Sequence, residues 1–415
     1  MIVFSFCCIL PLLTFFVSFY PYCIALHRPL NIRQVLHIWT MIWVWEYLPI
    51  GLNSLFFEFS QDGLIVLMSS GKAGFVCAPN KLWFEHPFTS SPCRSFRSTM
   101  ATSFRIVVVG DIHEDWDFEQ DYKALKSLQP DLVLFTGDFG NENYELVRSV
   151  AKIDMPKAAI LGNHDSWSTQ KFSSKKKDGV QLQLEALGEE HVGYGRLDFP
   201  ALKASVVGGR PFSCGGDNLF RKKLLKRFGV KTMEDSADKI HKAAMETPDG
   251  HSVIFLAHNG PAGLGSGPDD ICGKDWEGGG DFGDADLAQA ISLLKENSNY
   301  HVPLVVFGHM HKELLNGGFR KMISIGSDNT IYLNAAIIPR VKSSDLGKSR
   351  AFTVADFEDG KVTKVVETWV LVAEDETFKE EHILFDADIY VTQAAPLENP
   401  LIEPCLVGLS LSSET

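Results

Sequence analysis

Five short apolar runs, each followed at once by polar residues, constrain what this chain can fold into. They are FRIVVVGDIH, DLVLFTGD, AAILGNHD, SVIFLAHNG and PLVVFGHMH. A continuous Val, Ile, Leu and Phe run is typical of a buried strand in a mostly parallel sheet, because both faces of such a sheet are covered. Ligands of these sheets bind at the carboxyl ends of the strands, where all five polar clusters stand. The pattern therefore predicts one site that is divided among five strand ends.

Helical patterns separate these strands, which is the sequence form of βαβ units and predicts an α/β fold. After the first run, Phe118, Tyr122, Leu125 and Leu128 stand at helical spacing, and Pro130 then ends the helix. The later stretches TIYLNAAI, AFTVADFEDG and KVTKVVETWV alternate apolar and polar residues, as hairpin strands with one exposed face do. We expect a second sheet packed on the first.

The two ends of the chain differ in composition from its middle. Residues 1–26 contain no charged residue and are long enough to span a bilayer of about 30 Å, whereas residues 69–105 have the Ser, Arg and Pro of an organelle transit segment. Met100 opens directly onto the first strand. We expect an N-terminal extension over residues 1–100 that is not part of the fold, a folded domain over residues 101–372 and a tail over residues 373–415.

The composition limits the partners of the chain. A formal net charge of −13, from 39 basic and 52 acidic residues, argues against broad binding to nucleic acid or anionic lipid. Among Cys214, Cys272 and Cys405 no spacing of zinc or disulfide type occurs, which favours an intracellular protein with reduced cysteines. The plastid stroma or the cytoplasm is the expected location, and membrane contact is expected only if residues 1–26 are retained.

Oxygen and imidazole donors dominate the five clusters. The clusters contain Asp111, His113, Asp138, Asn163, His164, His258, His309 and His311. Imidazole combined with carboxylate and amide oxygen suits Mn²⁺, Fe or Zn²⁺, and the absence of cysteine from the clusters argues against a closed structural zinc site. In an extended strand the two histidines of GHMH point to one side, as a shared site requires. A single histidine could equally be structural, so the prediction of metal rests on the whole set.

The order GDIH, GD at 137–138, GNHD, a single His258 and GHMH resembles the signature of the calcineurin-like metallophosphoesterase superfamily, over roughly residues 104–371. The resemblance implies a four-layer α/β/β/α sandwich of two mixed β-sheets flanked by helices, with a dinuclear metal site at the strand carboxyl ends. It implies one metal on Asp111, His113, Asp138 and His311, and a second on Asp138, Asn163, His258 and His309, with Asp138 as the bridge. It further implies that His164 is the acid that meets the leaving group and that Asp165 orients it.

Neighbouring residues distinguish subfamilies. Ser/Thr phosphoprotein phosphatases carry Arg ahead of GNHE and Asp-Arg-Gly after the second block. Here Leu161 precedes GNHD, and the second block continues with FGNE at 139–142. The chain looks closer to the diverse branch that includes cyanobacterial and plant proteins of undefined substrate.

The leading functional expectation is a hydrolase of a phosphomonoester or phosphodiester, with a phosphorylated small molecule as substrate. Two divalent or trivalent ions about 3.5–4 Å apart lower the pKa of a bridging water, and the resulting hydroxide attacks phosphorus in line. Negative charge then builds on the leaving oxygen, where His164 stabilises it as general acid. One alternative is a non-catalytic scaffold of the same fold, which would be expected to lose ligands. Another is a membrane-associated enzyme that acts on phospholipids. The oligomeric state stays open.

One loop is expected to matter for access to the site. Residues 263–284 are rich in Gly and Asp and follow the His258 cluster, so we expect a flexible lid over the pocket, with a mobile surface loop as the alternative. Within it, Trp276 has two interpretations, as a ring that stacks on a base or sugar and as a packing anchor.

Overall fold

The computed structural model describes residues 55–60, 63–68, 103–169, 177–373 and 376–389. The chain divides into two units, Met1–Phe96 and Arg97–Thr415. In the first unit β1 (Leu55–Ser60) and β2 (Gly63–Met68) pair as an antiparallel hairpin. The predicted apolar segment at residues 1–26 lies outside the described residues. Among those described, no helix is both long and apolar enough to cross a membrane.

The first sheet of the second unit has the order β15-β14-β13-β3-β4-β5, with β12 paired to β13. Its strands are β3 (Ser103–Val109), β4 (Leu132–Phe135), β5 (Lys157–Ala159), β12 (Val341–Ser344), β13 (Gly347–Glu358), β14 (Lys361–Ala373) and β15 (Glu376–Asp386). β3, β4 and β5 run parallel, and β13 closes the other edge of β3 in antiparallel fashion. β15 falls in the segment predicted as a tail and pairs with β14.

The second sheet has the order β10-β11-β9-β8-β7-β6. Its strands are β6 (Arg196–Phe199), β7 (Ala204–Gly208), β8 (Ser252–Leu256), β9 (Leu304–Phe307), β10 (Ile323–Ile325) and β11 (Ile331–Asn334). The four central strands are parallel, and the outer strands β6 and β10 are antiparallel to their neighbours. Of the three later alternating stretches, TIYLNAAI supplies β11 of this sheet, whereas AFTVADFEDG and KVTKVVETWV fall in β13 and β14 of the first sheet. β13 and β14 extend the first sheet, because the order β3-β4-β5 leaves one edge of β3 open to β13.

The helices begin and end at residues whose side chains or backbone suit those positions. They are α3 (Phe118–Leu128), α4 (Tyr144–Ala151), α5 (Gly179–Leu187), α6 (Arg221–Phe228), α7 (Met233–Met245) and α8 (Ala285–Asn297), with short 3₁₀ turns at His164–Ser166, Gly188–Glu190 and Pro200–Leu202. Asp117 accepts a hydrogen bond from the Gln120 amide at the start of α3, and Thr232 and Asp235 form a capping box on α7. The helix predicted at 118–128 is confirmed.

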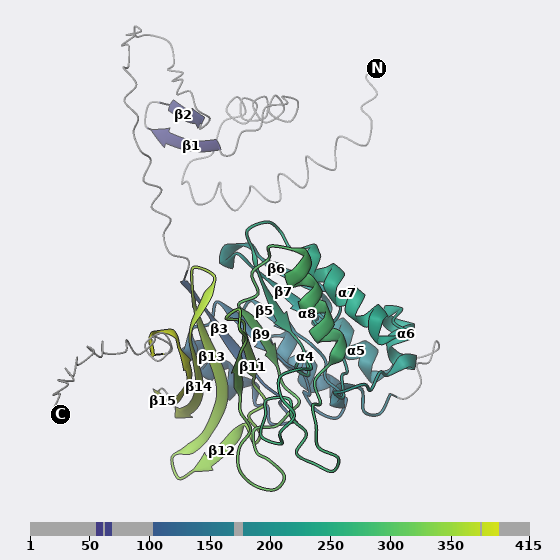
Figure 1. Ribbon diagram of the computed structural model, residues 1–415. Helices are drawn as coiled ribbons and strands as arrows, with labels where there is room; N and C mark the ends of the chain where they lie inside the picture. The colour runs from purple at the N-terminus through teal and green to yellow at the C-terminus, as the bar shows by residue number, and fades with distance from the viewer. Residues whose placement is uncertain (1–54, 61–62, 69–102, 170–176, 374–375, 390–415) are drawn as a thin grey trace, which may run out of the picture. The chain divides into compact units, whose positions relative to one another are not determined.

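Alternate residues along each strand face different layers. Ile106 and Val108 of β3 belong to a buried cluster with Ile254 of β8 and Val306 of β9, which places the two sheets face to face. The other faces of the two sheets pack against helices. Val107 and Val109 of β3 belong to a buried cluster that includes residues of α3 and α4. Phe255 of β8 and Phe307 of β9 belong to the same cluster, which also includes residues of α7 and α8. Helices thus cover both outer faces, with α7 and α8 side by side (Figure 1). This confirms the four-layer α/β/β/α sandwich.

Candidate metal centre

The predicted ligands follow five parallel strands of the two sheets. Asp111 comes after β3, Asp138 after β4 and Asn163 after β5, whereas His258 follows β8 and His309 follows β9. Ligand atoms lie within 4.8 Å of one another in three overlapping groups: Asp111, His113 and His311; His113, Asp138 and His164; Asp138, His258 and His309. Asn163 joins them through its Oδ1, which lies 2.9 Å from Nε2 of His258. The structure therefore brings together all of the residues that the sequence predicts as ligands.

Glycines in these turns leave room for the ligands themselves. A Cβ atom on Gly162 would lie 2.2 Å from Oδ1 of Asp138, and one on Gly308 would lie 2.1 Å from Oδ1 of Asp111. Both distances are far below van der Waals contact, so neither position accepts a side chain without displacing a carboxylate. Gly162 and Gly308 are therefore needed for the close approach of buried ligand side chains.

Hydrogen bonds orient the ligands before any metal binds. Nδ1 of His258 lies 2.8 Å from the Thr136 carbonyl oxygen, to which it donates, and this turns Nε2 toward Asp138. Asp111 accepts from the Thr136 hydroxyl at 3.1 Å and from the His309 amide at 2.9 Å. Thr136 thus supports one ligand from each sheet. Sequence reasoning missed this role because a Thr before a Gly-Asp turn carries no distinctive signal.

Two carboxylates are buried in this centre without a matching Lys or Arg. In the described parts of the chain, Asp111 and Asp138 form ion pairs only with histidines. Burial raises the pKa of Asp111 to about 7 when no cation is bound. Burial opposes ionisation of Asp138 as well, but the positive charge of His258 lowers the pKa of Asp138 below its usual range. Such charges need a nearby cation, so the centre suits metal ions.

The histidines divide into two kinds. Burial lowers the pKa of His309 to about 3 and that of His311 to about 4, and it also lowers the pKa of His113. These rings are therefore neutral at pH 7 and offer a lone pair to a metal. Burial alone would also lower the pKa of His258, but the facing carboxylates of Asp138 and Asp111 raise it to about 10. In metal-free protein a proton on His258 thus supplies positive charge that a bound cation would otherwise supply.

His164 lies at the rim of the centre, with a partner that differs from the predicted one. Its Nδ1 lies 2.7 Å from Oδ1 of Asn141, and its ring stacks on Trp167 with centroids 4.7 Å apart. The buried carboxylate of Asp165 instead accepts hydrogen bonds from the Phe139 amide at 2.9 Å and the Gly162 amide at 2.8 Å. Asp165 therefore fixes the two turns that carry the ligands, and Asn141 orients the ring of His164. The backbone of residues 137–142 places Asn141 beside His164, and this placement could not be predicted from the sequence.

The loop at 263–284 forms one wall of the centre. Its Trp276 lines a cavity of about 230 Å³ together with Asp138, His164, His309 and His311. The Trp276 ring packs edge-on against Phe282 at 5.0 Å between centroids, as an anchor does. Arg320, which is 4% exposed, donates to the Asp270 carbonyl at 2.8 Å and to the Asp275 carboxylate at 2.9 Å. These bonds tie the loop to the segment between β9 and β10, so in this structure the loop stands as a wall of the cavity, and the flexible lid stays a prediction. Arg320 was not singled out by sequence reasoning.

Comparison with known proteins identifies the class of this chain. The calcineurin-like phosphoesterase family matches residues 104–313, and the chain belongs to that family. Among solved structures, the chain is similar to PhoD, with 9% identity, a TM-score of 0.37 and coverage of 69% of this chain and 72% of that one. For vacuolar protein sorting 29 from Cryptosporidium parvum the identity is 12%, the TM-score 0.28 and the coverage 69% and 99%. For a predicted phosphoesterase from Streptococcus pneumoniae these values are 10%, 0.25, and 68% and 98%. The search of curated proteins gives no match.

Proposed function

We propose that this chain is a dinuclear metal-dependent hydrolase that cleaves a phosphomonoester or phosphodiester of a small molecule. One observation carries the proposal: donors from five strand ends converge on two buried carboxylates that have no Lys or Arg partner in the described chain. Metal-dependent phosphoester hydrolysis is what membership of the family implies. The complete donor set favours an enzyme over a scaffold of the same fold. The plant and cyanobacterial branch, and a stromal or cytoplasmic location, remain part of the proposal.

The donor set divides between two metal positions that share Asp138. Asp111, His113, Asp138 and His311 would hold one ion, and Asp138, Asn163, His258 and His309 would hold the other. Imidazole with carboxylate and amide oxygen suits Mn²⁺, Fe or Zn²⁺. When bound, two such ions polarise the phosphoryl group and activate a water molecule for in-line attack on phosphorus.

The protein's own contribution to leaving-group departure comes from His164. Because Asn141 accepts the Nδ1 proton at 2.7 Å, Nε2 is the ring atom left to give a proton to the leaving oxygen. Stacking on Trp167 holds the plane of the ring. The backbone amide of His164 also donates to Oδ1 of Asp138 at 2.9 Å, so this bond links the turn that carries the proposed acid to the turn that carries the proposed bridging carboxylate.

Hydrolysis of p-nitrophenyl phosphate and bis(p-nitrophenyl) phosphate by the Mn²⁺-loaded chain tests the proposal. We expect turnover of at least one ester, and a loss of kcat by a factor of about 100 or more in His164→Asn, as general acid catalysis contributes. His382→Asn is the matched control, because His382 is exposed on β15. Full activity of His164→Asn would refute the assigned acid, and no turnover of either ester would refute the function.

A further inference from the structure

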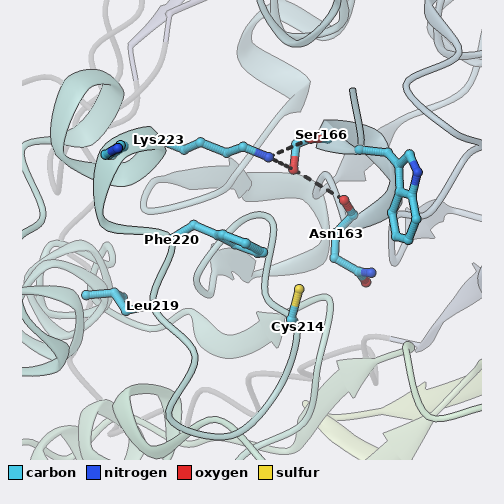
Figure 2. A pocket seen from close by; sticks show the side chains of 8 residues that line it. Asn163, Ser166, Cys214, Leu219, Phe220 and Lys223 are labelled. Atoms are coloured by element: carbon cyan, nitrogen blue, oxygen red, sulfur yellow. Dashed lines mark hydrogen bonds between the residues drawn. The ribbon is translucent and has the colours of Figure 1, made fainter. Parts of the chain in front are cut away.

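A second cavity, of about 450 Å³, lies next to the metal centre (Figure 2). Its lining residues are Asn163, Ser166, Trp167, Cys214, Leu219, Phe220, Lys222 and Lys223. The volume is within the range of about 300–1,000 Å³ that small-molecule sites occupy. Because Asn163 is also a candidate metal ligand, the cavity begins where the phosphoryl group would be held. An ester group bonded to that phosphorus can therefore extend into it.

Aromatic rings form the most distinctive part of the lining. The Trp167 side chain is 61% exposed and the Phe220 side chain is 37% exposed, although both are large and apolar. Trp167 stacks on His164, so the ring is held beside the proposed acid. Phe220 lies across the cavity from Asn163 (Figure 2). Exposed flat rings beside a polar centre favour a ligand that is itself planar, because ring faces stack.

The two lysines of the lining play different parts. Lys223 donates from its Nζ to the Ser166 hydroxyl at 2.9 Å and to the Ser166 carbonyl, and the same atom lies 5.0 Å from the Phe220 ring centroid. This lysine therefore ties α6 to the turn that follows β5 and steadies the Phe220 ring (Figure 2). Lys222 is exposed and lines the cavity, where its positive charge attracts an anionic substrate to an otherwise acidic protein.

The cavity of about 230 Å³ at the centre itself is less suited to such a group. Its lining includes the acidic residues Asp275 and Glu313. Its Trp276 ring is 38% exposed and packs edge-on against Phe282, whereas Trp167 is 61% exposed. Arg320 in that cavity is engaged by Asp275 and by loop carbonyls. Charge and the larger exposed surface of Trp167 therefore favour the cavity at Trp167 and Phe220.

We propose that this cavity binds the organic group of the substrate, and that this group carries a planar aromatic ring, as a nucleotide does. The inference rests on the proposed hydrolysis, because it names which phosphoesters that centre would accept. Adenosine 5′-monophosphate and ribose 5-phosphate provide a matched pair of probes, since they share the phosphate and the sugar and differ in the base. Phosphonate analogues of the two, in which CH₂ replaces the ester oxygen, resist hydrolysis. Their dissociation constants can therefore be compared by calorimetry on the Mn²⁺-loaded wild type, in which His164 still stacks on Trp167.

We expect the nucleotide to bind about tenfold or more tightly than the sugar phosphate, as stacking of one base provides. Phe220→Leu should reduce this ratio to about threefold or less, because part of the ring surface is lost. Phe378→Leu, the same change at an exposed phenylalanine of β15, should leave the ratio as it is.

Equal affinity for the two probes would overturn this inference, and so would a nucleotide preference that Phe220→Leu does not reduce. Neither result concerns hydrolysis, which the p-nitrophenyl esters test separately. A base preference that responds to Phe220→Leu, found together with no turnover of any ester, would support ring recognition and refute the proposed hydrolysis.

Discussion

The two sheets contribute chemically different halves to the metal centre. Strands β3, β4 and β5 of the first sheet lead into Asp111, Asp138 and Asn163, which offer oxygen atoms, and into His113 and His164, which offer imidazole nitrogen. Strands β8 and β9 of the second sheet lead into His258, His309 and His311, which offer only imidazole nitrogen. Negative charge is therefore confined to the first half. The second half supplies lone pairs, and the site forms only where the two sheets meet.

Hydrogen bonds across the sheets hold these halves in register. The His309 amide donates to Asp111 at 2.9 Å, and His258 donates to the Thr136 carbonyl at 2.8 Å. Each half thus positions a ligand of the other. A substitution in one half should consequently weaken metal binding at both positions. Its effect should depend on whether the substitution removes a charge or a lone pair.

Asp138→Asn removes charge from the first half and should have the largest effect. The bridging carboxylate would belong to both metal positions, so its loss should lower kcat on p-nitrophenyl esters on the order of a thousandfold. Metal content measured on the same sample should fall as well. Asp238→Asn, at an exposed position on α7, is the control and should behave as the wild type. Retention of more than about a tenth of wild-type kcat would show that the charge of the first half is not needed.

Removal of metal should make the stability of the protein depend on the proton that His258 then holds. The pKa of His258 is raised from 6.5 to about 10 in metal-free protein. Above pH 6.5 the unfolded chain loses this proton, whereas the folded protein keeps it until about pH 10, so stability falls as pH rises. Between pH 7 and 9 we expect a loss of about 2 kcal/mol, on the order of 5 °C in Tm, for protein treated with a chelator.

Two comparisons isolate the contribution of His258 to this pH dependence. His258→Gln should remove most of the slope of Tm against pH in the chelator-treated protein, because no proton is then held at this position. Metal-loaded wild type should show little slope, since Nε2 of His258 would bind metal in place of the proton. The pKa of Asp111 is raised only to about 7, so Asp111 contributes mainly below this window. A Tm that stays constant from pH 7 to 9 in chelator-treated wild type would contradict the assignment.

The ligands and the residues that hold them in place differ in how far the sequence could predict them. The sequence predicted the ligands and the strand ends that carry them, because each polar cluster directly follows an apolar run. The same local pattern predicted the α/β class. The neighbours of the ligands were not readable. Thr136 and Asp111 are joined across adjacent strands, and Arg320 holds residues of a loop far earlier in the chain. Such partners depend on tertiary packing, which no spacing in a single sequence specifies.

The same limit explains the sheet membership of the later strands. Alternating residues in 351–370 correctly predicted a hairpin, and β13 and β14 form one. Alternation indicates which side of a strand is buried, but it does not indicate which edge the strand joins. The open edge of β3 decides that, because β13 pairs there from Thr353 to Glu358.

Asn141 offers the smallest and most specific test of the first half, since it is a neutral partner of the proposed acid. Asn141→Ala removes the acceptor that lies 2.7 Å from Nδ1 of His164, and we expect kcat to fall about tenfold as the ring loses its orientation. Asn141→Asp keeps an acceptor and adds negative charge, which stabilises the protonated ring. The alkaline limb of the pH–rate profile should then move to higher pH by about one unit. If Asn141→Ala retains wild-type kcat, or if Asn141→Asp leaves that limb in place, the ring of His164 is not oriented through Asn141 during catalysis.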